Sequence, residues 1–159
     1  MDVLLDLLNS GPLVNGEEQD MLGDPADGRR WARERGGDGS LAELALLREA
    51  RDALRDVVRG QSSPAVLSPL LEGVHQIPEI TSNGLQWTVK TAPHARLAVE
   101  VVLAWAATEQ RLPGRLRPCA NAECRLFLLD RSRANRARWC SMAVCGNREK
   151  ARRHYERTR

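Results

Sequence analysis

Hydrophobic residues recur every three to four positions along much of the first 110 residues, which is the spacing of amphipathic helices. The clearest such segment is 41–59, where Ser40 and Glu43 form a capping-box pattern and Gly60 supplies the stop. The apolar positions of this segment fall on one helical face: Leu44, Leu47, Ala50, Leu54, Val57 and Val58. We expect this face to pack in the core.

Weaker patterns predict further helices on both sides of this segment. Helical spacing covers 2–9, 25–36 and 92–110, whereas Pro69 conflicts with a helix at 64–75. The last of these helices is the most apolar, and it is followed by Pro113-Gly114, which breaks the chain.

One segment predicts a β-hairpin rather than a helix. Asn83-Gly84 stands between two short β-prone runs, and this dipeptide is typical of a type I′ turn. We therefore expect a hairpin at about 79–90. The fold class is then α+β, with a mainly helical N-terminal domain over residues 1–112 and a small C-terminal module over 113–159.

All four cysteines of the chain lie in that module, as two C-x4-C pairs separated by fifteen residues: Cys119, Cys124, Cys140 and Cys145. Two such loops can bring four thiolates to one tetrahedral Zn²⁺ ion. Four protein ligands leave no position for a reacting water, so we expect a structural ion and no catalytic residue there. Disulfides are the alternative for a secreted chain, but no signal peptide is evident, and redox-active thiols more often occur as C-x2-C.

Charge divides the chain in the same place. Residues 1–110 hold 10 basic and 17 acidic side chains, net −7, whereas residues 111–159 hold 14 basic and 4 acidic ones, net +10. Thirteen of those 14 basic residues are arginine, whose planar guanidinium matches phosphate and guanine edges. The basic module is therefore predicted to bind double-stranded DNA, although solvation or balancing of the thiolate charge would also account for part of the excess.

The local pattern of the module predicts a finger. A strand at 126–129 is expected to pair with a second strand at 138–140, and a helix from Ser141 to Tyr155 follows, with Val144, Ala151 and Tyr155 on its inner face. The loop and the helix would carry the basic surface: Arg131, Arg133, Arg136, Arg138, Arg148, Lys150, Arg152, Arg153 and Arg157.

The string Cys145-Gly146-Asn147-Arg148, with the two cysteine pairs before it, resembles the CGNR zinc-finger family over residues 117–154. The resemblance implies that the four cysteines are the metal ligands and that Asn147 and Arg148 are a signature polar pair, which either contacts DNA or braces the finger. More weakly, residues 5–10, the Asp24-Pro25 helix start and the hairpin before a long helix resemble the ABATE domain that precedes this finger in the family.

Together these resemblances imply a cytoplasmic bacterial transcription regulator, of a kind described as stress-induced, whose N-terminal domain senses a small-molecule effector or dimerises. The competing hypothesis is a zinc-stabilised adaptor that docks on an acidic partner of the transcription machinery. We expect no enzyme, since no catalytic or nucleotide-binding motif occurs, and no membrane helix, since no apolar run is long enough.

Overall fold

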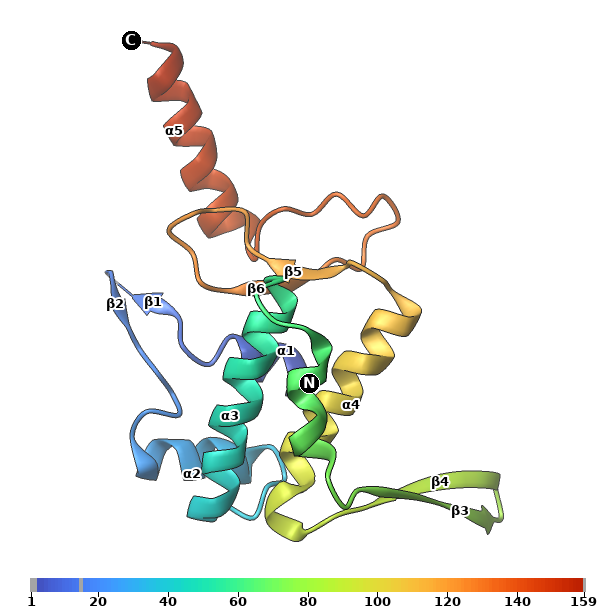
Figure 1. Cartoon of the computed structure of the whole chain (residues 1–159). Helices are drawn as coiled ribbons and strands as arrows, with labels where there is room; N and C mark the ends of the chain where they lie inside the picture. Colours follow the sequence, from blue (N-terminus) through green and yellow to red (C-terminus); the bar gives the residue numbers. More distant parts are fainter. Residues whose placement is uncertain (1–2, 15, 159) are drawn as a thin grey trace.

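The computed structural model describes residues 3–14 and 16–158 (Figure 1). Met1, Asp2, Asn15 and Arg159, and with them the outer ends of the predicted domains 1–112 and 113–159, lie outside the described residues. The fold class is α+β, as predicted: about half of the chain is helical, and the strands form small antiparallel pairs. The elements are α1 (Val3–Leu8), β1 (Leu13–Val14), β2 (Glu17–Glu18), α2 (Pro25–Glu34), α3 (Leu41–Val58), η1 (Pro64–Leu71), β3 (His75–Thr81), β4 (Gly84–Lys90), η2 (Pro93–Ala95), α4 (Arg96–Arg111), β5 (Leu116–Pro118), β6 (Phe127–Leu129), η3 (Met142–Gly146) and α5 (Asn147–Arg157).

Helix α3 is the centre of the helical body, and it begins where the sequence predicts. The hydroxyl of Ser40 accepts a hydrogen bond from the N–H of Glu43 at 3.0 Å. The carboxylate of Glu43 turns back to accept from the N–H of Gly39 at 2.7 Å, so both side chains pair with backbone donors that have no carbonyl partner within the helix. The face of α3 then packs against α1, α2 and α4, with Leu44, Leu47, Ala50 and Leu54 buried.

Helix α4 is the apolar partner of α3 and α1. Its buried residues lie in its first half, where Leu97, Val101 and Val102 join the core. The helix is 16 residues long. Within the described part of the chain, no helix is both long and apolar enough to span a membrane.

The hydrophobic core of the helical body extends into the C-terminal region. Leu116 of β5 and Phe127 of β6 are buried in the same cluster as Leu4, Leu8 and Leu97. Strand β6 also contacts α1 directly. The two short strands therefore anchor the cysteine-containing region on the helices.

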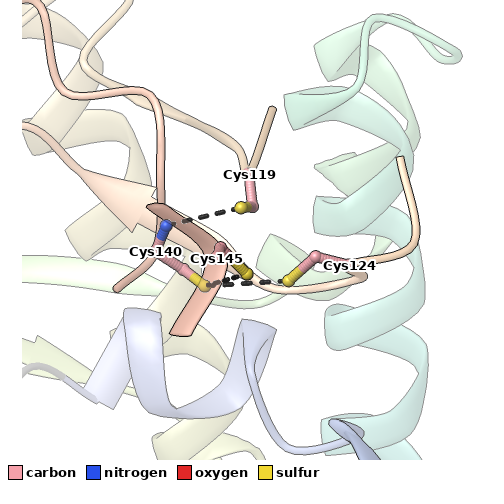
Figure 2. Close-up of side chains that lie close together, drawn as sticks. All are labelled: Cys119, Cys124, Cys140 and Cys145. Carbon is pink, nitrogen blue, oxygen red and sulfur yellow. Dashed lines mark hydrogen bonds between the residues drawn. The ribbon is translucent and has the colours of Figure 1, made fainter. Parts of the chain in front are cut away.

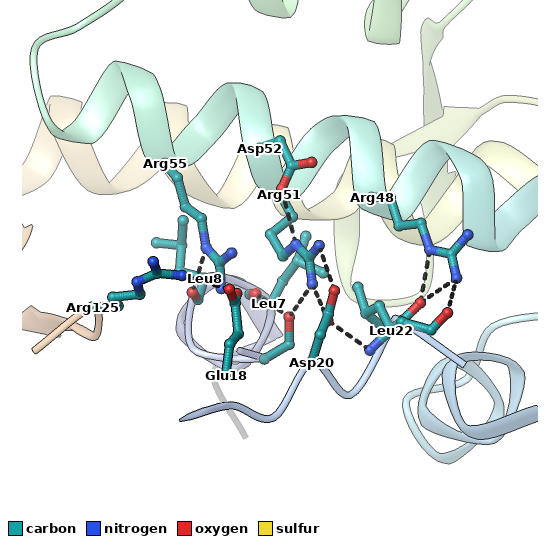
Figure 3. A network of polar contacts seen from close by, with 12 residues as sticks. Leu7, Leu8, Glu18, Asp20, Leu22, Arg48, Arg51, Asp52, Arg55 and Arg125 are labelled. Carbon is teal, nitrogen blue, oxygen red and sulfur yellow. Dashed lines mark hydrogen bonds and ion pairs between the residues drawn. The ribbon is translucent and has the colours of Figure 1, made fainter. Parts of the chain in front are cut away.

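A group of arginines on α3 holds the N-terminal segment against the helical body (Figure 3). The guanidinium of Arg51 is almost fully buried and forms an ion pair with Asp20 at 2.5 Å. One turn to either side, Arg48 donates to the carbonyl of Leu22 at 2.7 Å and Arg55 donates to the carbonyl of Leu8 at 3.0 Å. Because Leu8 is the last residue of α1, Arg55 occupies an acceptor that the helix itself leaves open.

The predicted hairpin is present, but it is longer than expected and its turn differs. Strands β3 and β4 pair over residues 75–90, with Thr81 opposite Gly84. Ser82 and Asn83 are therefore the central turn residues, and neither has a positive φ, whereas Gly84 has a φ of 99°. The prediction of a type I′ turn centred on Asn83-Gly84 is wrong, because the glycine occupies the last position of the four-residue turn rather than a central one.

Candidate metal centre

The four cysteines come from two loops that short secondary-structure elements hold together. Cys119 directly follows β5, and Cys124 lies in the loop that leads to β6. Cys140 precedes the serine that caps the next helical turn, and Cys145 lies inside that turn, η3. Each pair is thus separated by one tight turn of backbone, as the C-x4-C spacing predicts.

The four sulfur atoms form one compact cluster (Figure 2). They all lie within 4.8 Å of one another, and the Sγ atom of Cys140 is 3.7 Å from that of Cys124 and 3.7 Å from that of Cys145. A tetrahedral Zn²⁺ ion with Zn–S bonds of about 2.3 Å requires sulfur atoms about 3.8 Å apart. The residues therefore fit one structural Zn²⁺ ion, with a complete set of protein ligands.

The protonation of the cluster also favours a bound cation. Burial raises the pKa of Cys124 to about 11 and raises the pKa of Cys140 well above its ordinary value. Burial acts in the same direction on Cys145, but hydrogen bonds from Asn121 and the neighbouring thiols outweigh it and lower the pKa of that residue. Four thiolates this close together repel one another, so a divalent ion is what allows all of them to be deprotonated together.

Backbone and amide donors surround the cluster. The N–H of Cys140 donates to the sulfur of Cys119 at 3.4 Å, and the amide of Asn121 donates to the sulfur of Cys145 at 3.5 Å. The N–H of Ala120 donates to the carbonyl of Arg138 at 2.8 Å and so joins the two cysteine loops. Such donors orient thiolate ligands and offset their charge. Asn121 was not singled out from the sequence, although an asparagine two residues after a ligand is well placed for this contact.

The loop that carries four of the predicted DNA-contacting arginines is organised by Asp130. Its buried carboxylate accepts from the N–H groups of Ser132 at 2.9 Å and Ala137 at 2.8 Å, and it pairs with Arg117 at 2.7 Å. Hydrogen bonds from Ser132, chiefly from its hydroxyl, lower the pKa of Asp130 to about 2, with further lowering by Ala137 and Arg117. Asp130 thus holds the base of the loop closed around one buried negative charge.

The strand pairing of the finger differs from the prediction. Strand β6 is present at Phe127–Leu129, but its partner is β5 at Leu116–Pro118, not the segment 138–140. Residues 138–140 form no strand and instead bond to the first cysteine loop through the carbonyl of Arg138. Both segments, 116–118 and 138–140, are three residues long, so their length does not show which of them pairs with β6. Only the path of the chain after α4 brings Leu116 beside Leu129.

The helix that follows the second cysteine pair begins as predicted, but it is not packed as predicted. The hydroxyl of Ser141 accepts from the N–H of Val144 at 3.4 Å and caps η3, which continues into α5. No described residue of α5 is buried, and Tyr155 is 74% exposed. The expected inner face of Val144, Ala151 and Tyr155 is therefore wrong, because α5 projects away from the body instead of lying on it (Figure 1).

The predicted DNA-contacting residues are all exposed, and they lie on two segments at one end of the molecule. Figure 1 shows the loop after β6 and helix α5 at the end of the molecule opposite α2 and the β3–β4 hairpin. The loop carries Arg131, Arg133, Arg136 and Arg138, and α5 carries Asn147, Arg148, Lys150, Arg152, Arg153 and Arg157.

Several of these side chains also contact the finger itself. The amide of Asn147 donates to the carbonyl of Ala143 at 3.2 Å, which braces the start of α5. Arg148 lies 3.8 Å from Glu123, in the first cysteine loop. Arg152 and Arg153 share Glu149, at 2.7 and 3.0 Å. The three arginine side chains are more than half exposed, so their guanidinium groups remain accessible to a ligand.

Gly146, between the last cysteine and Asn147, has a local role. It is buried, and a Cβ atom at this position would lie 3.3 Å from Cδ1 of Trp139 and 2.8 Å from Sδ of Met142. The glycine therefore allows the turn that bears Cys145 to pack closely on Trp139.

Comparison with known proteins supports the same assignment for this part of the chain. Residues 115–158 match the family model of the CGNR zinc finger, and the match contains all four cysteines and α5. None of the curated proteins searched matches the chain. The C-terminal region is thus a zinc finger of the CGNR type.

Proposed function

We propose that the protein is a zinc-dependent, DNA-binding transcription regulator in which the finger contacts double-stranded DNA. The observation that carries this proposal is helix α5, which has no buried residue and bears five basic and two acidic side chains over 11 residues. A free helix of this length is only marginally stable in water, so its preformed, unpacked state favours a role in binding. The major groove of DNA admits an α-helix, and arginine is the side chain that most often reads guanine there.

The zinc ion would have a structural role and no catalytic one. It would hold the turn η3, from which α5 extends, against the loop that carries Arg131 to Arg138. Asp130 would keep that loop closed without adding an exposed negative charge, since its carboxylate is buried. Phosphate contacts by the loop would then fix the orientation of α5, and base contacts from α5 would supply any sequence preference.

Selection from a random duplex library tests this proposal. Zinc-loaded protein is expected to enrich one sequence motif, whereas Cys140→Ser protein, which lacks one metal ligand, is expected to enrich none. Because Cys140→Ser protein could unfold its finger, a second variant tests the surface alone. This α5 variant replaces three exposed basic residues with glutamine: Arg148, Lys150 and Arg157.

A matched variant separates contact from overall charge. The body variant makes the same charge change on the helical body, at Arg30, Arg33 and Arg111. Enrichment by the body variant but not by the α5 variant supports the proposal. Equal enrichment by both variants, or none by wild-type protein, contradicts it.

An adaptor function is the second candidate, and exposed apolar residues favour it. Met142 and Val144 are more than half exposed beside the metal centre. Val144 lines a hollow of about 490 Å³ between the finger and the β1–β2 pair, together with Leu13 and Leu126. An acidic partner protein with an apolar anchor would suit this surface. Val144→Lys distinguishes the two functions, since it should abolish capture of such a partner and leave DNA binding intact or slightly stronger.

The helical region would then serve as the sensing part, as the resemblance to the ABATE domain implies, with stress as one source of the signal. A cavity of about 310 Å³ lies where η1 meets the start of α4, and Leu46, Glu72, Thr91 and His94 are among its lining residues. This volume is at the small end of the range for ligand sites. A small molecule that binds there should raise the melting temperature of wild-type protein but not of a variant with Ala98→Phe, which fills the cavity.

A further inference from the structure

The β3–β4 hairpin extends from the helical body as an arm (Figure 1). It forms a two-stranded sheet, and no third strand joins it among residues 3–14 and 16–158. An isolated two-stranded hairpin is at best marginally stable in water. Large apolar side chains are nevertheless exposed on it: Ile80 is 83% exposed, Trp87 59% and Leu85 58%.

The pairing register sorts the side chains of the arm onto two different faces. Directly opposite residues share a face, and the faces alternate along the strands. One face carries the pairs Gln76–Val89, Pro78–Trp87 and Ile80–Leu85, which are apolar except for Gln76. The other face is mainly polar, and Glu79 there accepts from the Thr88 hydroxyl at 3.0 Å and lies 3.9 Å from Lys90. The arm is thus amphipathic, with an apolar face that no described element covers.

The two edges of the arm are not equivalent. A two-residue turn makes Thr81–Gly84 a hydrogen-bonded pair. The alternate pairs Ile80–Leu85, Pro78–Trp87 and Gln76–Val89 therefore point their backbone N–H and C=O groups outward. On β3 the central outward residue is Pro78, which has no N–H to donate. A proline at this position protects an edge against pairing with another strand.

On β4 the outward residues are Leu85, Trp87 and Val89, and each has both a donor and an acceptor. Trp87 is the middle residue of this strand, which runs from Gly84 to Lys90. The β4 edge is therefore an open pairing site of three residues, whereas the β3 edge is blocked.

We propose that β4 pairs with β4 of a second copy of this chain, in antiparallel orientation about a two-fold axis at Trp87. The result is a continuous four-stranded sheet in the order β3–β4–β4–β3. A two-fold axis requires each residue of the strand to meet a compatible residue of its copy. About Trp87, the tryptophan meets itself, Leu85 meets Val89, and Gln86 meets Thr88.

Charge and shape support a second copy over a different partner. None of these pairs brings two charges together, since the only charged residue of β4, Lys90, faces Gly84 of the other copy. Leu85, Trp87 and Val89 all project from the apolar face, so pairing joins two apolar faces into one surface. Aromatic and aliphatic side chains directly opposite one another stabilise a sheet.

The area buried between the two β4 edges determines the affinity that we expect for the dimer. A seven-residue strand spans about 23 Å, so pairing two such edges buries less surface than the roughly 800 Å² per partner of a stable complex. The dimer should therefore be weak, with a dissociation constant in the micromolar range, and reversible. Pairing through β4 does not depend on the proposed DNA-binding function.

Sedimentation velocity without nucleic acid tests the proposal, from about 1 to 500 µM protein, which brackets weak association. Wild-type protein should pass from monomer to dimer. Trp87→Lys and Trp87→Glu should each raise the dissociation constant at least about tenfold, because each puts two like charges face to face on the axis. A 1:1 mixture of the two variants should form a heterodimer, since the axis then joins a lysine to a glutamate.

Ile80→Lys is the control, since Ile80 is on the same apolar face but on the blocked strand β3. Its dissociation constant should stay within about twofold of wild type. Wild-type protein that stays monomeric at the highest concentration overturns the proposal. So does a mixture that forms no heterodimer, or an Ile80→Lys variant as defective as Trp87→Lys, which would indicate packing of face on face.

Discussion

The side chain of Asn9 forms two hydrogen bonds with the backbone of Phe127, 118 residues later in the chain. Its amide donates to the carbonyl of Phe127 at 3.1 Å, and its oxygen accepts from the N–H of Phe127 at 2.7 Å. Asn9 follows α1 directly, and the ring of Phe127 lies in the core beneath the guanidinium of Arg59, 4.7 Å from its centre. The side chain of Asn9 thus adds two hydrogen bonds to the core contacts that hold β6 on the helical body.

Replacing Asn9 with alanine should destabilise the protein by about 2 kcal/mol, because two buried backbone groups lose their partner. The measurement is the free energy of unfolding in urea, with zinc present. Asn83→Ala serves as the control, since Asn83 is an exposed turn residue of the hairpin. A loss below about 0.5 kcal/mol for Asn9→Ala, equal to that of a surface substitution, would contradict this role.

Removal of zinc should unfold the finger while most of the helical body persists. Structural zinc supplies on the order of 10 kcal/mol to small fingers, and helix α5 has no packing of its own. We expect one zinc ion per chain by native mass spectrometry. A chelator should release it and lower the helical circular dichroism by the contribution of α5, with recovery on adding Zn²⁺. Protein that is purified without metal and keeps the full signal would be inconsistent with this site.

The ion pair between Arg51 and Asp20 should make stability depend on pH. Burial acts to raise the pKa of Asp20, but hydrogen bonds from Arg51 and Leu22 outweigh it and lower that pKa below 3.8. A carboxylate with a lowered pKa in the folded state stabilises the protein above pH 3.8, and this contribution is lost as the pH falls through the lower value.

The variant Asp20→Asn should therefore cost about 2–3 kcal/mol at pH 7, since it leaves the nearly buried Arg51 short of a counter-charge. Between pH 4 and pH 2 its stability should fall less steeply than that of wild-type protein. Urea unfolding across this range compares the two, and parallel curves would show that Asp20 does not titrate with folding. Asp52→Asn, whose carboxylate is exposed, is the matched control.

How far the sequence predicts this structure depends on how local each interaction is. Helix α3 follows from its own cap and apolar period, and the cysteine cluster follows from two short loops, so both are correctly predicted. The pairing of β5 with β6 could not be predicted, because Leu116 reaches Leu129 only after α4 has packed on the body. The contact of Asn9 with Phe127 and the exposure of Tyr155 likewise depend on tertiary arrangement.

Glu149 provides a test of the DNA interface that strengthens binding instead of weakening it. Its carboxylate pairs with Arg152 and Arg153, and it is an acidic group on the proposed contact helix. Glu149→Gln should increase DNA affinity severalfold at low salt, because it removes repulsion from phosphates and releases two arginines. Fluorescence anisotropy with a labelled duplex measures the change. Weaker binding by this variant would mean that the ion pairs orient the arginines rather than restrain them.

The salt dependence of DNA binding tests most directly whether the zinc-held basic surface contacts the phosphate backbone. Each phosphate contacted contributes about −0.9 to the slope of the logarithm of the association constant against the logarithm of salt concentration. For zinc-loaded wild-type protein we predict a slope steeper than about −3, for the α5 variant a slope shallower by about one to three, and for the body variant no change. No binding by wild-type protein at the lowest salt concentration, or equal slopes for all three proteins, would contradict DNA recognition by this finger.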